Sequence, residues 1–348
     1  MTNRVKRLAF GAQLGQARGI ASSLADACHS IALLETMSRS TPDSGAPNAN
    51  VLSGILLMMA GMSILPAMDA TAKYLADYVS PVQVAFVRFA LQSLFALGLG
   101  LCFGRSVGSI VREMNRLQLI RGSCLAIASL FFFSAVKYMP LADAIAIFFV
   151  QPMILTVFSA VFLKEQVGIR RWCAVAIGMV GALIIIRPGT NALGLYSLLP
   201  LCAATSFATY LMFTRKLSGS TSLLGTQFTV GLSGIVLLGP LVLIASLLDF
   251  APAAWTTPPM EVMPLFILVA AISLVSHGLV VMAFERAPAS ALAPLNYTEI
   301  ISATLIGYLV FGDIPESSVW IGVALIAGGG IYIAYRERKV AKAQRATQ

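Results

Sequence analysis

Long apolar stretches separated by short polar turns fill the chain from residue 51 to residue 335. A helix needs about 20 predominantly apolar residues to cross the hydrocarbon core of a bilayer, and ten stretches qualify or come close. They are Leu52–Ala72, Val82–Phe103, Leu117–Val136, Leu141–Leu163, Trp172–Ile186, Leu195–Phe213, Leu223–Leu247, Val262–Phe284, Ala289–Phe311 and Val319–Tyr335. The pattern predicts an all-α integral membrane protein with ten transmembrane helices.

The basic residues between these stretches predict the orientation of the chain. Cytoplasmic loops of membrane proteins carry an excess of Lys and Arg. With the N-terminus inside, 20 Lys and Arg residues fall on cytoplasmic segments, against Lys73, Lys137 and Arg187 outside and Arg88 within a span. A missed helix would scramble this alternation, so the count predicts an even number of helices with both termini in the cytoplasm.

The first fifty residues do not continue the pattern. The stretch 8–34 follows three basic residues, but Gln13, Arg18 and Asp26 interrupt any apolar run, which makes it a poor signal peptide or span. Two interpretations stay open for this extension: an interfacial amphipathic helix, or a true translation start at Met37, which precedes a polar linker.

An internal repeat appears when the chain is shifted by 148 residues, which places the fourth and fifth stretches on the ninth and tenth. The matched positions are Ala135 with Ala283, Pro140 with Pro288, Glu165 with Asp313, Trp172 with Trp320 and Gly181 with Gly329. Each half then holds five helices, and an odd number forces the second half to insert upside down relative to the first. Two inverted five-helix repeats are typical of transporters that bind substrate between the halves near the middle of the membrane. A duplication kept only for packing is the alternative.

This organisation divides the chain into four expected parts. They are an N-terminal extension over 1–50, a first repeat over 51–190, a second repeat over 191–336 and a basic cytoplasmic tail over 337–348.

Composition narrows the class further. Hydrophobic residues make up 58% of the chain and charged residues 11%, whereas soluble domains average roughly 25% charged residues. A net charge of +9 would suggest nucleic acid in a soluble protein, but in a membrane protein it reflects cytoplasmic loops and lipid headgroups. Five scattered cysteines without a C-x-x-C motif and two histidines predict no disulfide framework, metal site or cofactor.

The most recognisable segment is FSAVKYMPLADAIAIFFVQPMILTVFSAVFLKEQVGIRRWCAVAIGMVGALIIIRPG, from Phe133 to Gly189, and it has a weaker echo over Ala283–Ala334. Together they resemble the two EamA-type domains of the drug/metabolite transporter superfamily, and the likeness runs from Val51 to the C-terminus. The resemblance implies a ten-helix transporter with a central cavity, driven by an ion gradient or by exchange. Consistently, the sequence has no G-x-x-x-x-G-K-[ST] nucleotide-binding loop.

Two shorter segments, Asp69-Ala-Thr-Ala-Lys73 and Val87-Arg88-Phe89, are similar to bacterial vitamin and metabolite importers within that superfamily, including riboflavin and S-adenosylmethionine carriers. The resemblance implies uptake of a vitamin such as riboflavin, with S-adenosylmethionine, or export of an amino acid, drug or metabolite, as alternatives. The expected location is the bacterial inner membrane. The expected partners are a small-molecule substrate and the lipid bilayer, with a homodimer left open and nucleic acid excluded.

Polar residues inside the apolar stretches are the candidate substrate site. A charge at the bilayer centre costs at least about 2.5 to 3.5 kcal/mol on insertion scales, so each one is a functional candidate. Glu299 lies near the middle of the ninth stretch and its repeat mate Gln151 near the middle of the fourth. We expect both to contact substrate. Desolvation favours a protonated carboxyl group, which makes Glu299 a candidate proton carrier; a structural hydrogen bond is the alternative.

Neighbours of Glu299 extend this polar patch. Asn296 and Tyr297 lie a turn earlier, and Pro294 removes a backbone hydrogen bond from the same helix. Their repeat mates are Phe148 and Phe149. Aromatic faces at these positions would stack on a flat ring substrate, and aromatic core packing is the alternative.

A charged cluster is expected near the outer ends of the first helices. Asp69 and Lys73 are spaced i,i+4, which allows them to form an ion pair on one helix. Arg88 either joins them or extends toward the interface, and Asp143 starts the fourth stretch on the same side, near Lys137. The cluster predicts an outer gate or an attraction for anionic substrate, and a structural ion-pair network is the alternative.

Alternatives of another class are an enzyme, a receptor and a lipid scramblase. Gly231-Leu-Ser233-Gly234 lies in the seventh stretch and His277 in the eighth, an arrangement similar to the Ser/His pair of rhomboid-type intramembrane proteases. A serine becomes nucleophilic only beside a base, but the same pattern is common in glycine-rich apolar helices. The sequence therefore predicts a protein that is not an enzyme.

Overall fold

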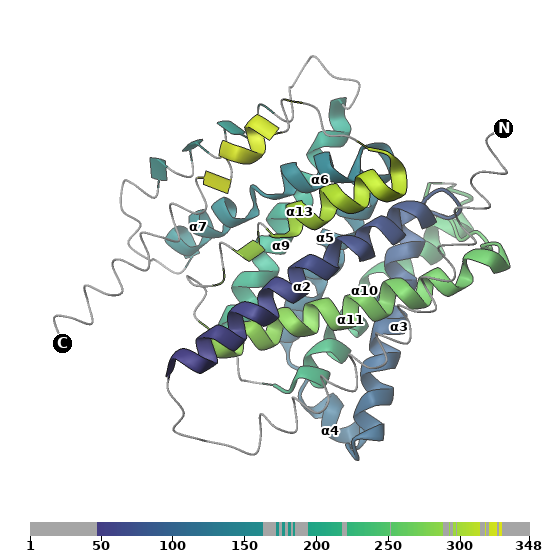
Figure 1. The fold of residues 1–348 in the computed structure, drawn as a ribbon. Coiled ribbons are helices and arrows are strands. Elements are labelled where there is room, and N and C mark those ends of the chain that lie inside the picture. Colours follow the sequence, from purple (N-terminus) through teal and green to yellow (C-terminus); the bar gives the residue numbers. More distant parts are fainter. Residues whose placement is uncertain are drawn as a thin grey trace. The chain divides into compact units, whose positions relative to one another are not determined.

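The computed structural model describes most of the predicted membrane region (Figure 1). The described residues are 47–162, 172–173, 176–177, 180–181, 184, 194–217, 221–250, 252–287, 292, 295–296, 298–313, 317, 320–325 and 327–328, with only the backbone given for 47–50, 156, 159–162 and 215. The elements in this part are all helical: α2 (Pro47–Leu75), α3 (Pro81–Cys102), α4 (Val107–Arg112), α5 (Arg116–Tyr138), α6 (Leu141–Phe148), α7 (Gln151–Phe162), η1 (Gly194–Ser197), α9 (Leu198–Lys216), α10 (Leu223–Leu247), η2 (Met260–Val262), α11 (Met263–Arg286), α13 (Thr298–Ile306) and η4 (Gly307–Phe311).

Six of the predicted stretches coincide with helices long and apolar enough to cross a membrane. These segments are Val51–Leu75, Pro81–Cys102, Arg116–Tyr138, Leu195–Thr214, Leu223–Leu247 and Met260–Arg286. Shorter apolar helices occupy Leu141–Leu155 and Thr298–Phe311, while the fifth and tenth stretches lie largely outside the described residues. The chain is therefore a multi-pass membrane protein.

Burial separates a central helix from peripheral ones. In α11, 83% of the apolar window is buried inside the protein, against 39% to 56% in the other five spans. α10 instead leaves Val236, Leu243 and Leu247 mostly exposed, as expected of side chains that meet lipid tails. α11 therefore brings its polar residues, Ser273 and His277, into the interior.

Three helices begin at polar capping residues in the turns. Ser80, Asn115 and Ser222 precede α3, α5 and α10, and each side-chain oxygen accepts a hydrogen bond from the backbone N–H three residues later. Such a cap satisfies one of the N–H groups that the first turn of a helix leaves unpaired. These caps fix where the three helices start.

The fourth predicted stretch is not a continuous helix. α6 ends at Phe148 and α7 begins at Gln151, with a turn between them. Pro152 explains the interruption, because proline lacks the N–H that would bond to the Phe148 carbonyl and its ring collides with that carbonyl. The prediction of one helix over Leu141–Leu163 was wrong for this reason.

Glycines let neighbouring helices approach closely. A Cβ atom at Gly234 would lie 2.3 Å from Cγ of Phe89, and one at Gly231 would lie 2.6 Å from Cβ of Ser93. α10 therefore packs against α3 at these two positions, and Gly61 of α2 packs in the same way against α11, which runs beside it in Figure 1. Small residues at helix interfaces are a common means of close packing in membranes.

Candidate functional site

A cavity lies between helices from both halves of the chain. Its lining comes from α2, α5 and α6 in the first half and from α9, α11 and α13 in the second. The lining residues are Leu65, Met68, Asp69, Leu125, Ala128, Ser129, Phe132, Phe133, Phe148, Phe207, His277 and Glu299. The volume of about 40 Å³ has room for only a few water molecules. A metabolite would fit only after the helices move apart.

Three ionisable side chains belong to this lining. Asp69, His277 and Glu299 are 3%, 4% and 4% exposed. Asp69 lies within electrostatic range of both Arg88 and Glu299. Charges in such an enclosed place are costly unless they are paired or neutralised. Arg88 is in range of Asp69, and among the described residues only Asp69 is in range of Glu299, which leaves the Glu299 carboxyl available for a proton or a cation.

Arg88 is fixed beside the cavity by α5 and α11. Its Nε donates to Oγ of Ser273 at 2.8 Å and its Nη1 donates to Oγ of Ser129. Its guanidinium carbon lies 4.3 Å from the ring centre of Phe89 and 5.9 Å from that of Phe133. The side chain is fully buried. Arg88 therefore lies inside the protein and does not extend toward the membrane interface, which was the other predicted position.

The polar contacts continue from Arg88 across three helices. Ser273 donates to Oε1 of Gln92 at 3.0 Å, Gln92 donates to Oε1 of Gln227 at 3.0 Å, and Gln227 donates to the carbonyl of Leu274 at 2.9 Å. Gln92, Gln227 and Ser273 were not predicted from the sequence. The available signal was the i,i+4 spacing of Arg88 and Gln92 on one face of α3.

The repeat mates Gln151 and Glu299 both lie at helix starts, at the first residue of α7 and in the first turn of α13. Glu299 lines the cavity, whereas Gln151 and Asn296 are buried outside the lining, at 3% and 8% exposed. Nε2 of Gln151 and Oδ1 of Asn296 have no hydrogen-bond partner within the described ranges. Tyr297 lies outside the described residues.

Aromatic rings form one side of the cavity. The ring centre of Phe148 lies 5.4 Å from that of Phe132 and 5.3 Å from that of Phe207, and Phe207 lies 6.4 Å from the ring of His277. Of the two predicted stacking residues, Phe148 belongs to the lining, whereas Phe149 is buried outside it. Phe148, its neighbour in the sequence, is the aromatic residue that α6 contributes.

Lys73 does not pair with Asp69, and the predicted ion pair was wrong. Nζ of Lys73 lies 2.7 Å from Oδ2 of Asp313 and 4.5 Å from the ring centre of Phe311, while Asp69 lines the cavity. The i,i+4 spacing permits an ion pair but does not require one. The carboxylate of Asp313, which follows η4, pairs with Lys73 instead. Asp143 is half-buried in the first turn of α6.

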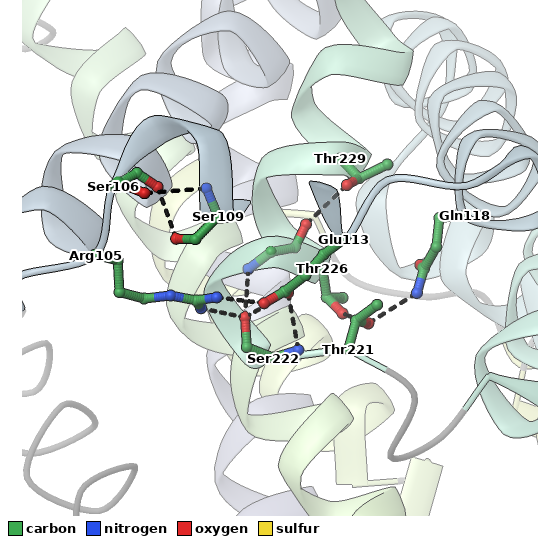
Figure 2. Close-up of polar contacts among 10 residues, drawn as sticks. Arg105, Ser106, Ser109, Glu113, Gln118, Thr221, Ser222, Thr226 and Thr229 are labelled. Carbon is green, nitrogen blue, oxygen red and sulfur yellow. Dashed lines mark hydrogen bonds and ion pairs between the residues drawn. The ribbon is translucent and has the colours of Figure 1, made fainter. Parts of the chain in front are cut away.

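A second polar cluster, the Glu113 cluster, consists of Arg105, Glu113, Gln118, Thr221 and Ser222 (Figure 2). Arg105 donates to both Glu113 and Ser222. Oε2 of Glu113 accepts hydrogen bonds from the backbone N–H and the hydroxyl of Ser222 at 3.0 and 2.7 Å. Beside them, Gln118 donates to the hydroxyl of Thr221 at 2.8 Å. The cluster joins the segment between α3 and α5 to the start of α10.

Glu113 is charged in this cluster at neutral pH. Burial alone would raise its pKa, but hydrogen bonds from Ser222 and Arg105 outweigh burial and hold the pKa below the usual 4.5. A carboxyl whose pKa is lower in the folded state stabilises the protein above its unfolded pKa, and that stabilisation is lost as the pH falls through the folded value. The cluster therefore stays intact across the physiological range.

The protease alternative finds no support in the geometry. The hydroxyl of Ser233 donates to the carbonyl of Thr229 at 2.7 Å in its own helix, and a Cβ atom at Gly122 would lie 2.4 Å from it. No hydrogen bond joins Ser233 to His277 in the described part of the chain, and the His277 ring lies 6.2 Å from that of Tyr210. The glycines and Ser233 of this pattern pack α10 against α3 and α5.

Comparison with known proteins settles the family. The model of the EamA-like transporter family matches the chain twice, over residues 52–187 and 194–335. The chain belongs to the EamA-like transporter family. This confirms the resemblance noted in the sequence.

Individual relatives of this EamA-like transporter match nearly their whole length. A riboflavin transporter of Vibrio cholerae is 27% identical over 303 residues, which cover 84% of this chain and 97% of that protein. An S-adenosylmethionine uptake transporter of Rickettsia bellii is 27% identical over 276 residues, which cover 78% and 90%. A solved crystal structure shares the fold, with a TM-score of 0.58 at 17% identity over 84% of this chain and 99% of that one.

Proposed function

We propose that this EamA-like protein is a secondary transporter that moves a small ring-containing metabolite across the bacterial inner membrane by alternating access. The observation that carries the proposal is the cavity, because four phenylalanines and three ionisable side chains from both halves of the chain converge on it. Concave sites with mostly apolar walls and a few convergent polar groups are typical of small-molecule binding.

Riboflavin is the leading substrate, because its flat ring system suits stacking against Phe148 and Phe207 and because a relative is a riboflavin transporter. S-adenosylmethionine is the second candidate. Asp69 and Glu299 favour it, since carboxyl groups in the lining suit its sulfonium and ammonium charges.

The proposed architecture is ten helices in two inverted halves with both termini in the cytoplasm. The 20 to 3 distribution of basic residues supports the orientation. The helix starts at Gln151 and Glu299 support the inversion, because transporters of this kind bind substrate at the ends of interrupted helices. In this arrangement Gln151 and Asn296, with their unpaired amide atoms, would reach substrate once the cavity widens.

Two ion pairs are proposed as gates on opposite sides. In the proposed orientation Lys73 and Asp313 lie on the outer side, and the Glu113 cluster lies on the cytoplasmic side. With both formed, the cavity between them is too small for a metabolite. Substrate entry and release would therefore break one gate at a time.

Glu299 is the proposed proton carrier. It shares the cavity with Asp69 and has no ion-pair partner of its own in the described residues. A buried carboxyl without a counter-charge favours its protonated form. Uptake of a proton from one side and release to the other would then accompany the movement of substrate.

Uptake into proteoliposomes containing the purified full-length protein tests the proposal. We expect labelled riboflavin or S-adenosylmethionine to accumulate under an inward proton gradient and to stop accumulating when the gradient is collapsed. Uptake of neither metabolite above empty liposomes would refute the proposed substrates. Uptake that is indifferent to the gradient would refute the proton coupling.

A further inference from the structure

One buried cation in the bundle is not used by the arrangement described so far. Arg121 on α5 is 2% exposed, and its Nε and Nη2 atoms have no hydrogen-bond partner among the residues that the structure describes. No carboxylate lies within ion-pair distance of it in the part of the chain that the structure describes. A buried guanidinium carries a large desolvation cost that only a counter-charge offsets.

The position of Arg121 connects it to the cavity. Leu125, Ala128 and Phe132 line the cavity from α5, and they follow Arg121 at i+4, i+7 and i+11, which is one face of a helix. Arg121 therefore lies one turn beyond the lining on the same face.

The opposite helix supports the same placement. The hydroxyl of Tyr210 on α9 lies within electrostatic range of Arg121. The Tyr210 ring lies 5.4 Å from that of Phe207 and 6.2 Å from that of His277, and both of these residues line the cavity. Tyr210 thus bridges the cavity and Arg121.

The other buried cation of this region, Arg88, also has one nitrogen, Nη2, without a hydrogen-bond partner among the described residues, but the rest of its guanidinium is paired. It makes two hydrogen bonds to serine hydroxyls and lies in electrostatic range of Asp69. Arg121 has neither kind of partner among the described residues. Of the two buried guanidinium groups, only Arg121 has no carboxylate in range among the described residues.

We propose that Arg121 is a specificity-determining residue that binds an anionic group, a carboxylate or phosphate, of the transported molecule. The proposal rests on the proposed transport function and favours the second candidate, S-adenosylmethionine, which carries a carboxylate, over riboflavin, which carries no anionic group. The guanidinium presents planar, paired N–H donors that match such oxyanions. Asp69 and Glu299 in the lining would at the same time accept a cationic group, so a substrate with both charges would satisfy both parts of the site.

Two matched ligand pairs test the role of Arg121. S-adenosylmethionine and its decarboxylated form differ by a carboxylate, and riboflavin 5′-phosphate and riboflavin differ by a phosphate. We measure how each compound competes with uptake and how far it raises the unfolding temperature of the detergent-solubilised protein. The wild type should bind the anionic member of the pair it accepts about tenfold or more tightly than the other member.

Variants decide whether that preference comes from Arg121. Arg121→Gln should abolish the preference, Arg121→Lys should keep part of it, and Arg116→Gln, at an exposed position of the same helix, should leave it unchanged. Without ligand, Arg121→Gln should unfold at the same or a higher temperature, because it removes an unpaired buried charge. A wild-type preference for the members that lack the carboxylate or phosphate would overturn the proposal, and so would an intact preference in Arg121→Gln. A lower unfolding temperature of Arg121→Gln with equal losses of binding for both members would overturn it as well.

Inorganic anions distinguish the two sources of negative charge and separate this proposal from the proposed function. Sodium phosphate or sodium chloride alone could raise the unfolding temperature of the wild type as much as any organic ligand does, with no such increase in Arg121→Gln. That result would show that the site binds a free anion, and it would overturn the assignment to a substrate group. If no organic pair binds, the proposed substrates fail. In that case, a rise in unfolding temperature with phosphate that is lost in Arg121→Gln would still support an anion site. A rise that persists in Arg121→Gln would overturn the anion site as well.

Discussion

The cavity and the Glu113 cluster both gather charged and polar side chains, but they differ in how completely those groups are paired. In the Glu113 cluster, Arg105 and Glu113 contact each other, and both contact Ser222 (Figure 2). Around the cavity, in contrast, Arg121 retains unpaired N–H groups and Glu299 has no ion-pair partner in the described residues.

The difference indicates where the protein can respond to a ligand. A cluster whose charged groups are paired has a defined lowest-energy arrangement and holds two segments together. Burying a polar group without a hydrogen-bond partner is unfavourable in free energy, and a bound molecule that supplies the partner removes that penalty. The cavity is therefore the region where substrate chemistry should matter, and the Glu113 cluster the region where only the balance between conformations should change.

Glu299→Gln should give the largest effect. The substitution keeps the size of the side chain but removes the titrating carboxyl, and we expect proton-driven uptake to fall by about thirtyfold, or roughly 2 kcal/mol. The remaining uptake should no longer vary with pH. Glu261→Gln, at an exposed acid before α11, is the control. Uptake and pH dependence like those of the wild type would remove Glu299 from the mechanism.

Phe207→Leu should have the next largest effect. It retains an apolar side chain in the lining but removes ring stacking, which contributes about 1 kcal/mol beyond burial. We expect the KM for a ring-containing substrate to rise roughly fivefold with little change in the maximal rate. Phe250→Leu, where the ring is 57% exposed, should leave both constants unchanged. Equal losses in the two variants would argue against stacking in the cavity.

The Lys73–Asp313 pair should contribute less. Its side chains are partly exposed, and such pairs stabilise by about 1 kcal/mol or less. We expect Lys73→Asp and Asp313→Lys each to change the uptake rate by about fivefold or less, and the double variant to recover most of the change because the charges are exchanged. A double variant no better than the single ones would count against a gate.

Glu113→Gln should give a still smaller change. The Glu113 carboxyl is partly exposed, so the ion pair contributes at most about 1 kcal/mol and weakens at high salt. We expect a modest change in uptake rate and an unchanged pH profile, since the lowered pKa keeps Glu113 charged throughout the range. Arg112→Gln, exposed on the neighbouring short helix α4, is the control. A pH profile that shifts with Glu113→Gln would contradict the division of roles between the two regions.

Ser233→Ala should have the smallest effect. Its hydroxyl only returns a hydrogen bond to the preceding turn of its own helix, an interaction with little net value. We expect uptake within about twofold of the wild type, because losing this local hydrogen bond should change the free energy of unfolding by about 0.5 kcal/mol or less. Abolished activity, or covalent labelling of Ser233 by a fluorophosphonate probe, would revive the protease alternative.

Much of the fold could be predicted, because helix length and position depend on local composition. The boundaries of α10 coincide with the prediction at Leu223 and Leu247. The break before Gln151 was not predicted, because apolar residues continue on both sides of Pro152 and the hydrophobic pattern alone does not show where a helix is interrupted. Among the residues at or beside the cavity, the sequence pointed to Asp69, Glu299 and Arg88, since an isolated charge in an apolar run stands out without knowledge of its neighbours, and to Phe148 through the repeat.

The sequence alone determined that this chain crosses the membrane many times, where most of those helices begin and end, and which family it belongs to. These properties follow from runs of apolar side chains, capping residues and recognisable segments. Only the tertiary structure decided that Lys73 meets Asp313, that Gln92 meets Gln227 and that Arg121 meets no carboxylate in the described part of the chain. Partners that lie 135 or 240 residues apart are chosen by the packing of whole helices, and local spacing does no more than permit them.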